Sequence, residues 1–308
     1  AAVEEDTETL LVEVDDSVPL TVPEGAYAQF RVRLTAEPAN AAFLQVDNVG
    51  GDTDLNPVSL VEFGTPFGNF SVALYDQDTP ITVENFLNYI LRGSYAGTFV
   101  QRLDPGFVIQ GGGYYIGAQD EYEYLPREPA IQNEPTRSNI RGTIAMAKVP
   151  GDSDSATSEW FINLTDNSGF LDTDNGGYTA FGEVIWGGMG VVDQIEALPI
   201  HNVEADLEAA DPDAEFYGAL EEVPIRDVNP VEPSDPDNLV HTEVSIVSPV
   251  IFTAENWDQW QLVTVRADAD PDFENGIAQF RFSFAEAAED TLLQIAEVDD
   301  EVACVFNA

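Results

Sequence analysis

The sequence predicts a mainly β protein with more than one domain, on three observations. Its 308 residues exceed the size of one average domain, so two domains are the expectation. Apolar and polar residues alternate with period two over residues 28–34, 68–75 and 278–284, as in strands with one buried face. Amphipathic helical spacing is found in two segments, 78–93 and 187–198.

Residues 1–56 carry strand patterns. Residues 10–14 and 43–46 are short strand-like runs, and residues 28–34 form the alternating strand. Three or four strands are too few to close a sandwich by themselves. Another part of the chain must therefore cover their apolar face.

Residues 249–308 have the complementary pattern. Apolar runs at 250–252 and 261–266 lead to an acidic turn at 268–276, and the alternating strand 278–284 follows. This segment therefore offers further strands of the same kind.

The end of the chain also repeats its beginning. Residues 289–300 match much of residues 5–16, as expected where one sequence repeat gives way to the next. We therefore expect a single β-sandwich formed by 1–56 and 249–308, with a domain at 57–248 inserted between its halves. Insertion is tolerated at exposed loops, because the termini of a domain usually lie close together. Two unrelated β flanks are the alternative.

The middle segment begins with a strand and a helix. The alternating strand covers 68–75, and the helix within 78–93 carries an apolar stripe. Thr82 or Thr79 can cap its start, and Gly93 can end it.

The middle segment ends in a long loop and one more strand. The second helix is expected over 187–198. Residues 202–237 are acidic and proline-rich with little periodicity, so we expect a surface excursion. Residues 239–247 then give a last strand.

The central motif is the stretch 99–113. Two strand-like runs flank a Pro-Gly turn at 105–106, and three glycines end the stretch. If the runs pair as a hairpin, Arg102, Phe107 and Gln110 converge on one groove. Arginine offers five donors in a rigid fork and stays charged. A solvent-exposed arginine without a role is the alternative.

This stretch resembles the signature of the cyclophilin-type peptidyl-prolyl isomerases of the bacterial secreted kind, F-H-R-x-x-P-G-F-x-x-Q-G-G. Gln101 stands where the family has histidine. Residues 141–148, 155–162 and 170–182 are similar to the family's R-G-x-x-x-M-A, S-x-x-S-Q-F-F-I and W-L-D with H-x-V-F-G. The four blocks come in the right order over about half the chain.

The resemblance implies a fold and a reaction for residues 57–248. The fold is a closed antiparallel β-barrel capped by two helices. The reaction is rotation about the X-Pro amide bond, whose barrier is about 18–20 kcal/mol and whose uncatalysed exchange takes tens to hundreds of seconds. No metal or cofactor is required, and the partners are proline-containing polypeptides.

The resemblance also assigns site residues. Arg102 would stabilise the twisted amide, with Phe107 in the proline pocket and Gln110 on the substrate backbone. The other residues implied to bind substrate are Val108, Ala147, Lys148, Phe161, Phe170, Leu171 and Tyr178.

The sequence departs from the family pattern around that core. Val108, Lys148, Glu159, Phe170 and Tyr178 stand where the family has methionine, asparagine, glutamine, tryptophan and histidine. The arginine, phenylalanine and glutamine are intact, so we expect activity. Weak cyclosporin binding is expected, because Phe170 lacks an indole N–H.

The charge of the chain is extreme, with 57 acidic against 11 basic residues and a net charge of −46. Such a surface repels nucleic acids and anionic membranes, which are bound through Lys and Arg clusters. The sequence therefore excludes both as partners. Solvation in salty water and bound cations are the two open causes of the acidity.

Calcium is the cation to consider. Residues 22–34 and 252–276 resemble halves of Calx-beta-like sandwich repeats of bacterial surface proteins, and Calx-beta-like domains are similar to known calcium binders. The weak metal candidates are Asp268, Asp270, Asp272 and Glu274. Residues 172–183 imitate an EF-hand loop, but position five is glycine. A solvated acidic turn is the favoured interpretation, and we expect no cofactor.

The cysteine content and the apolar runs of the sequence bear on the cellular location. The single cysteine, Cys304, excludes an internal disulfide and leaves the redox compartment open. No apolar run is long enough to span a bilayer. We expect an extracytoplasmic protein (periplasmic, secreted or on the cell surface) whose secretion signal is absent from this chain.

Two classes of function stay open. The first is an active prolyl isomerase fused to a surface-type sandwich. The second is a non-catalytic module that binds proline-containing segments, or a surface or adhesion module. The intact Arg102 favours the enzyme, because a pure binder has no need of it.

Overall fold

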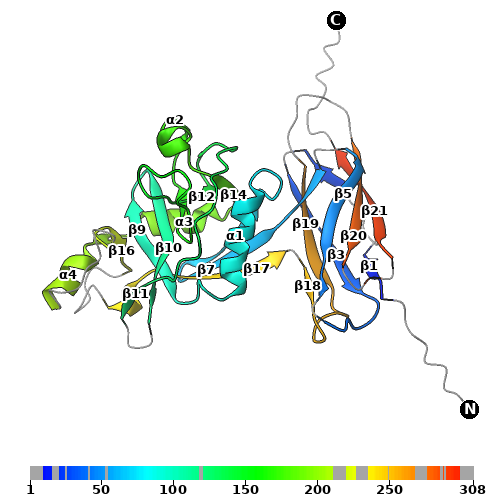
Figure 1. The fold of residues 1–308 in the computed structure, drawn as a ribbon, viewed down its shortest axis with the longest axis horizontal. Helices are drawn as coiled ribbons and strands as arrows, with labels where there is room; N and C mark the ends of the chain where they lie inside the picture. Colours follow the sequence, from blue (N-terminus) through cyan, green and yellow to red (C-terminus); the bar gives the residue numbers. More distant parts are fainter. Residues whose placement is uncertain are drawn as a thin grey trace, which may run out of the picture. The chain divides into compact units, whose positions relative to one another are not determined.

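The chain is mainly β and falls into two compact units, residues 1–60 with 247–308, and residues 61–246 (Figure 1). The computed structural model describes residues 10–15, 21–24, 26–40, 42–52, 55–117, 121–210, 220–226, 235–248, 250–267, 276–284, 287 and 289–298. Within these ranges, no helix combines the length and the apolar character needed to span a membrane.

The first unit is a β-sandwich with strands from both ends of the chain. One sheet has the order β1 (Val12–Val14), β3 (Tyr27–Leu34), β19 (Gln261–Ala267), β6 (Leu55–Val58). The other has the order β2 (Thr21–Pro23), β21 (Thr291–Val298), β20 (Ile277–Ser283), β5 (Gln45–Gly51), and β4 (Ala42–Phe43) pairs with β18 (Ile251–Phe252). Figure 1 shows the early strands beside the late ones in both sheets.

The two sheets share one apolar core. Phe30 on β3 meets Phe282 on β20 edge to face, with ring centroids 5.6 Å apart. Both rings are buried, and residues from both chain segments surround them. Each segment therefore covers the apolar face that the other leaves open.

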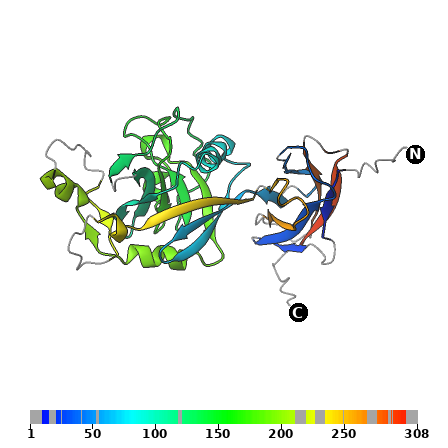
Figure 2. The ribbon, with the colours of Figure 1, turned by 90° about the horizontal axis from the view of Figure 1, so that it is seen from below.

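The second unit is a closed barrel of eight strands, and each pairing whose register is described is antiparallel. The order around it is β10 (Val108–Ile116), β13 (Trp160–Asn163), β12 (Thr143–Met146), β14 (Ala180–Ile185), β8 (Gly68–Leu74), β7 (Leu60–Thr65), β17 (His241–Ser248), β9 (Thr98–Asp104) and back to β10. The short strand β11 (Tyr122–Tyr124) adds to β10. Figure 2 shows β17 beside β7, the last and first strands of the barrel in sequence.

The helices of this unit are α1 (Pro80–Leu91), α2 (Ser168–Leu171), α3 (Met189–Glu196) and α4 (Val203–Ala210). The two predicted helices, α1 and α3, bury their apolar sides in the barrel core through Phe86 and Val192. Phe86 lies 5.0 Å from Phe181 of β14 between ring centroids.

The start of α1 differs from the expectation. The N-cap is Thr79, but neither Thr79 nor Thr82 supplies a side-chain cap, and the Thr79 hydroxyl donates to the Tyr75 carbonyl instead. Glu134, far along the chain, accepts hydrogen bonds from the Ile81 and Thr82 backbone N–H groups at 3.2 and 2.8 Å. A carboxylate at a helix N-terminus satisfies free N–H groups and the helix dipole together.

We predict that Glu134→Ala lowers the free energy of unfolding by about 1–2 kcal/mol, the usual cost of losing a cap. Thermal unfolding followed by circular dichroism would measure it. Glu84→Ala, at an exposed position on α1, is the matched control because it removes the same charge without touching the helix start. Equal melting temperatures for the two variants would contradict the capping role.

One expectation about local structure was wrong, and a second was incomplete. The strand expected at 43–46 is two strands, because β4 ends at Phe43 and β5 runs from Gln45 through the glycines to Gly51. The excursion 202–237 contains α4, whose Val203 and Leu207 pack beside Phe99 of the barrel. Two apolar residues four apart in an acidic run give too weak a period to be read from the sequence.

The two acidic segments considered for calcium have different outcomes. In the EF-hand-like loop, Asp172 accepts hydrogen bonds from the backbone and side chain of Asn139, and the loop ends in the barrel strand β14. The candidates 268, 270, 272 and 274 lie outside the described residues. Among the described residues, no group of three or more His, Cys, Asp or Glu side chains is arranged to hold a metal ion.

Candidate functional site

A hairpin of β9 and β10 carries the polar part of the site. Its register places Arg102 directly opposite Gln110, so the two side chains share one face. The turn between the strands is closed by a hydrogen bond from the Phe107 N–H to the Asp104 carbonyl at 3.0 Å. Gly106 takes a φ of +72° there, a backbone conformation that favours glycine.

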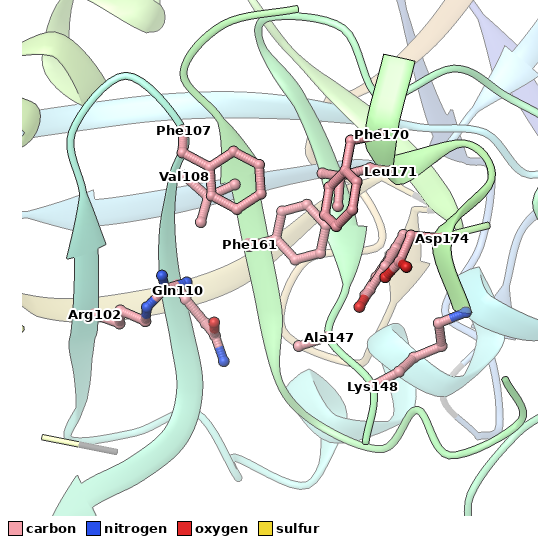
Figure 3. Close-up of a pocket in the computed structure, with 11 residues that line it drawn as sticks. Arg102, Phe107, Val108, Gln110, Ala147, Lys148, Phe161, Phe170, Leu171 and Asp174 are labelled. Atoms are coloured by element: carbon pink, nitrogen blue, oxygen red, sulfur yellow. The ribbon is translucent and has the colours of Figure 1, made fainter. Parts of the chain in front are cut away.

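This hairpin borders a pocket of about 220 Å³ that contains every predicted catalytic and substrate-binding residue (Figure 3). The lining residues are Arg102, Phe107, Val108, Gln110, Ala147, Lys148, Phe161, Phe170, Leu171, Asp174 and Tyr178. Asp174 is the lining residue that the sequence analysis did not name as part of this site.

The floor of the pocket is apolar and buried. Val108, Phe161 and Leu171 are buried in one cluster, and Phe161 is only 4% exposed. Phe161 lies opposite Gln110 in the β10–β13 pairing, and its ring meets Tyr178 edge to face at 5.8 Å between centroids. A compact apolar ring, such as that of proline, suits this floor.

Arg102 lies at the polar edge of the pocket between two carboxylates. Its Nη2 donates to Asp104 Oδ2 at 2.8 Å, and its Nε donates to Glu222 Oε2 at 3.0 Å. Nη1 donates to no residue in the described part of the chain. The guanidinium is therefore held at one edge while a nitrogen remains available to a ligand.

Gln110 is oriented by a charged neighbour. Its Nε2 donates to Glu159 Oε2 at 2.8 Å, and Gln101 Nε2 donates to the same oxygen at 3.0 Å. Arg127 Nη2 donates to Glu159 Oε1 at 3.1 Å. Because the amide nitrogen of Gln110 is engaged, its oxygen is the end that can accept a hydrogen bond from a peptide N–H.

The triple glycine lets these groups approach. A methyl group on Gly111 would lie 2.7 Å from Cζ2 of Trp160, and one on Gly113 would lie 2.5 Å from Nε2 of Gln101. Side chains at these positions would therefore displace Trp160 or Gln101. Gln101, at the place of the family histidine, also accepts a hydrogen bond from the Gly113 N–H at 2.7 Å.

The opposite wall of the pocket carries the only lysine of the chain. Lys148 Nζ donates to the backbone carbonyls of Asn175 and Gly177 at 2.9 and 2.6 Å and lies 4.7 Å from the centroid of the Tyr178 ring. Burial lowers the pKa of Lys148, while the charge of nearby Asp174 opposes the shift. Burial also raises the pKa of Tyr178 above its ordinary value.

Asp174 was missed because its position depends on the backbone after α2. It opens the 3₁₀ turn η1 (Asp174–Gly176), which joins Leu171 to Tyr178. The sequence pattern did single out Asp174, but as position three of the EF-hand-like loop rather than as part of a peptide-binding groove.

The comparisons with known proteins agree on one family. Residues 60–213 match the family model described as "Cyclophilin type peptidyl-prolyl cis-trans isomerase/CLD". The chain is 41% identical over 143 residues to peptidyl-prolyl cis-trans isomerase A of Dickeya dadantii, covering 45% of this chain and 72% of that protein. It is 39% identical over 146 residues to peptidyl-prolyl cis-trans isomerase B of Escherichia coli, covering 45% of this chain and 85% of that one.

Among solved structures, a cyclophilin-type peptidyl-prolyl cis-trans isomerase of Cryptosporidium parvum is similar to the chain with a TM-score of 0.42. The sequence identity is 21%, and the match covers 63% of this chain and 99% of that one.

Proposed function

The chain belongs to the cyclophilin-type peptidyl-prolyl cis-trans isomerase family, and on that premise we propose that its isomerisation is assisted by Arg102 at the pocket edge. The observation that carries this proposal is the guanidinium beside an apolar pocket, with Nη1 donating to no described residue. The enzyme is a peptidyl-prolyl isomerase, and enzymes of this family need no cofactor.

The reaction is accelerated by electrostatic stabilisation at one substrate atom, the prolyl nitrogen. The C–N bond of an X-Pro peptide resists rotation because the nitrogen lone pair is delocalised into the carbonyl. In the twisted transition state that lone pair is localised on the prolyl nitrogen. A hydrogen bond from Arg102 to this nitrogen is stronger in the twisted state than in either planar state, so it lowers the barrier.

The other pocket residues hold the substrate while the bond turns. The proline ring occupies the apolar floor between Phe107, Val108, Phe161 and Leu171. The amide oxygen of Gln110 accepts a backbone N–H of the peptide, and the backbone at Ala147 and Lys148 binds the residues before proline. These contacts fix one side of the peptide, which leaves rotation of the other side as the productive motion.

A protease-coupled isomerisation assay on an X-Pro peptide tests the proposal against its alternative, a non-catalytic module that binds proline-containing segments. Arginine-assisted catalysis requires exchange far faster than the uncatalysed tens to hundreds of seconds. Saturable peptide binding without any acceleration would instead support the binding module.

Phe170 is an exposed residue of the pocket lining whose side chain bears on cyclosporin binding. Phe170 lies on α2 at the pocket rim and is 56% exposed, so it can contact a large ligand. We predict weak cyclosporin binding, and we predict that Phe170→Trp tightens it by about tenfold, the worth of one hydrogen bond to the added indole N–H. Isothermal titration of both proteins would measure the change.

The control for this prediction is Trp186→Phe, an exposed aromatic change in the barrel unit outside the pocket lining. It should leave cyclosporin affinity unchanged. An unaltered dissociation constant for Phe170→Trp would show that Phe170 does not occupy the place of the family tryptophan.

A further inference from the structure

We propose that Glu222 is a positioning residue that holds the guanidinium of Arg102 in its catalytic orientation. This inference rests on the proposed role of Arg102. Glu222 lies 120 residues after Arg102 and accepts the Nε–H at 3.0 Å. It also lies beyond residues 60–213, the part of the chain that the family model matches.

The segment that carries Glu222 is anchored on the barrel at both sides of the residue. The backbone carbonyl of Glu222 accepts a hydrogen bond from the Leu103 N–H at 2.8 Å, directly after Arg102 on β9. Leu220 and Val223 are fully buried in one cluster with Phe99, which lies on the same strand. The carboxylate is therefore presented to Arg102 from a fixed backbone.

The segment that carries Glu222 also makes contacts with parts of the chain outside β9. β16 (Val223–Pro224) pairs with β15 (Ile200–His201), and the buried Ile225 forms an isolated bridge with Leu239. The N–H of Leu220 donates to Glu204 Oε2 on α4 at 3.3 Å. Residues 220–226 therefore form a structured support beside β9.

Hydrogen bonds from two different nitrogens to two carboxylates fix the orientation of the guanidinium plane. Asp104 accepts a hydrogen bond from Nη2, and Glu222 accepts one from Nε. Rotation about the last bonds of the arginine side chain would therefore break at least one of these hydrogen bonds. Nη1 is left for the prolyl nitrogen. A free arginine would lose rotamer freedom on reaching the transition state, whereas a held one has lost it beforehand.

The same carboxylates also lower the positive potential at the site, which opposes catalysis. Both are well exposed, with side-chain exposures of 48% for Glu222 and 40% for Asp104, so water and salt screen their charge. The substrate amide is neutral, and its hydrogen bond depends on direction as much as on potential. Positioning is therefore the larger effect.

The test compares Glu222→Ala with Glu221→Ala in the full chain. Glu221 is the exposed neighbour of Glu222, has the same charge, and makes no hydrogen bond or ion pair with a described residue. We expect Glu222→Ala to lower kcat about threefold, the range of an exposed ion pair, with KM unchanged because the contact serves the transition state. Glu221→Ala should match the wild type, and Glu222→Gln should recover most of kcat because its amide oxygen still accepts from Nε.

The combination with Arg102→Ala separates this inference from the role of Arg102 itself. If Glu222 acts through the arginine, adding Glu222→Ala to Arg102→Ala causes no further loss. Equal kcat values for Glu222→Ala and Glu221→Ala, a kcat that rises in Glu222→Ala, or an equal loss in both backgrounds would each overturn the positioning role. Wild-type kcat in Arg102→Ala alone would overturn the proposed function, and the positioning role with it.

Discussion

Arg102→Ala should lower kcat/KM for an X-Pro peptide by about a hundredfold, the usual cost of removing one donor aimed at transition-state charge. The loss should fall on kcat, because the hydrogen bond to the prolyl nitrogen forms only as the amide twists. Peptide affinity should change little, since the apolar floor around Phe161 stays in place.

The fold should survive this change. The Arg102 side chain is 34% exposed, and both of its carboxylate partners reach solvent, so no buried charge is left without a partner. Circular dichroism and thermal unfolding should therefore resemble those of the wild type. A melting temperature lowered by many degrees would mean that the rate loss reflects the fold.

Arg92→Ala is the matched control for Arg102→Ala. Arg92 is an exposed, ion-paired arginine at the end of α1, bound to Glu128 and outside the pocket lining. Its removal makes the same change in net charge and should leave the rate unchanged. Arg102→Lys adds a second test, because a compact ammonium cannot reproduce the planar fork and should recover only part of the activity. A near-wild-type rate in Arg102→Ala would refute the mechanism.

The part of the pocket formed by the β9–β10 hairpin could be predicted because it is local in sequence. A hairpin with one tight turn fixes which residues face each other, so the spacing of Arg102 and Gln110 already places them on one face. The lining residues outside the hairpin, among them Phe161 and Leu171, came from the resemblance alone. No periodicity in the sequence relates Phe161 or Leu171 to that hairpin.

The residues that the sequence did not reveal act over long separations. Glu134 reaches the start of α1 across 52 residues, and Glu222 reaches Arg102 across 120. In a chain with 57 acidic residues, the sequence does not distinguish a carboxylate with a structural contact from the other acidic residues. Only the closed barrel brings these particular carboxylates to the start of α1 and to Arg102.

The Calx-beta-like character of the two flanking segments stays a prediction. Their strands pair across the chain, β3 with β19 and β5 with β20, as a sandwich split in sequence requires. Pairing of this kind is common to many sandwiches, however, and the acidic turn that carries the calcium candidates lies outside the described residues.

The second large effect concerns the net charge of −46. That many carboxylates repel one another in the folded state, and dissolved salt screens the repulsion. The Debye length falls from about 10 Å at 0.1 M salt to about 3 Å at 1 M. We expect the melting temperature to rise by about 10 °C between these concentrations of NaCl, which at about 2–4 °C per kcal/mol corresponds to ~2.5–5 kcal/mol. Sucrose at matched osmolality is the control, because it leaves charge interactions unscreened.

Calcium distinguishes screening from bound metal. If the acidity serves solvation in salty water, millimolar CaCl₂ should add little at matched ionic strength, and the NaCl effect should continue without saturating. A calcium site would instead stabilise the native state by RT ln(1 + [L]/Kd), an effect that saturates and that sodium cannot imitate. We expect the first outcome, because neither acidic segment completes a recognised calcium loop in the sequence. A saturable calcium shift that disappears in Asp270→Asn would reverse this conclusion and place a metal site in the acidic turn.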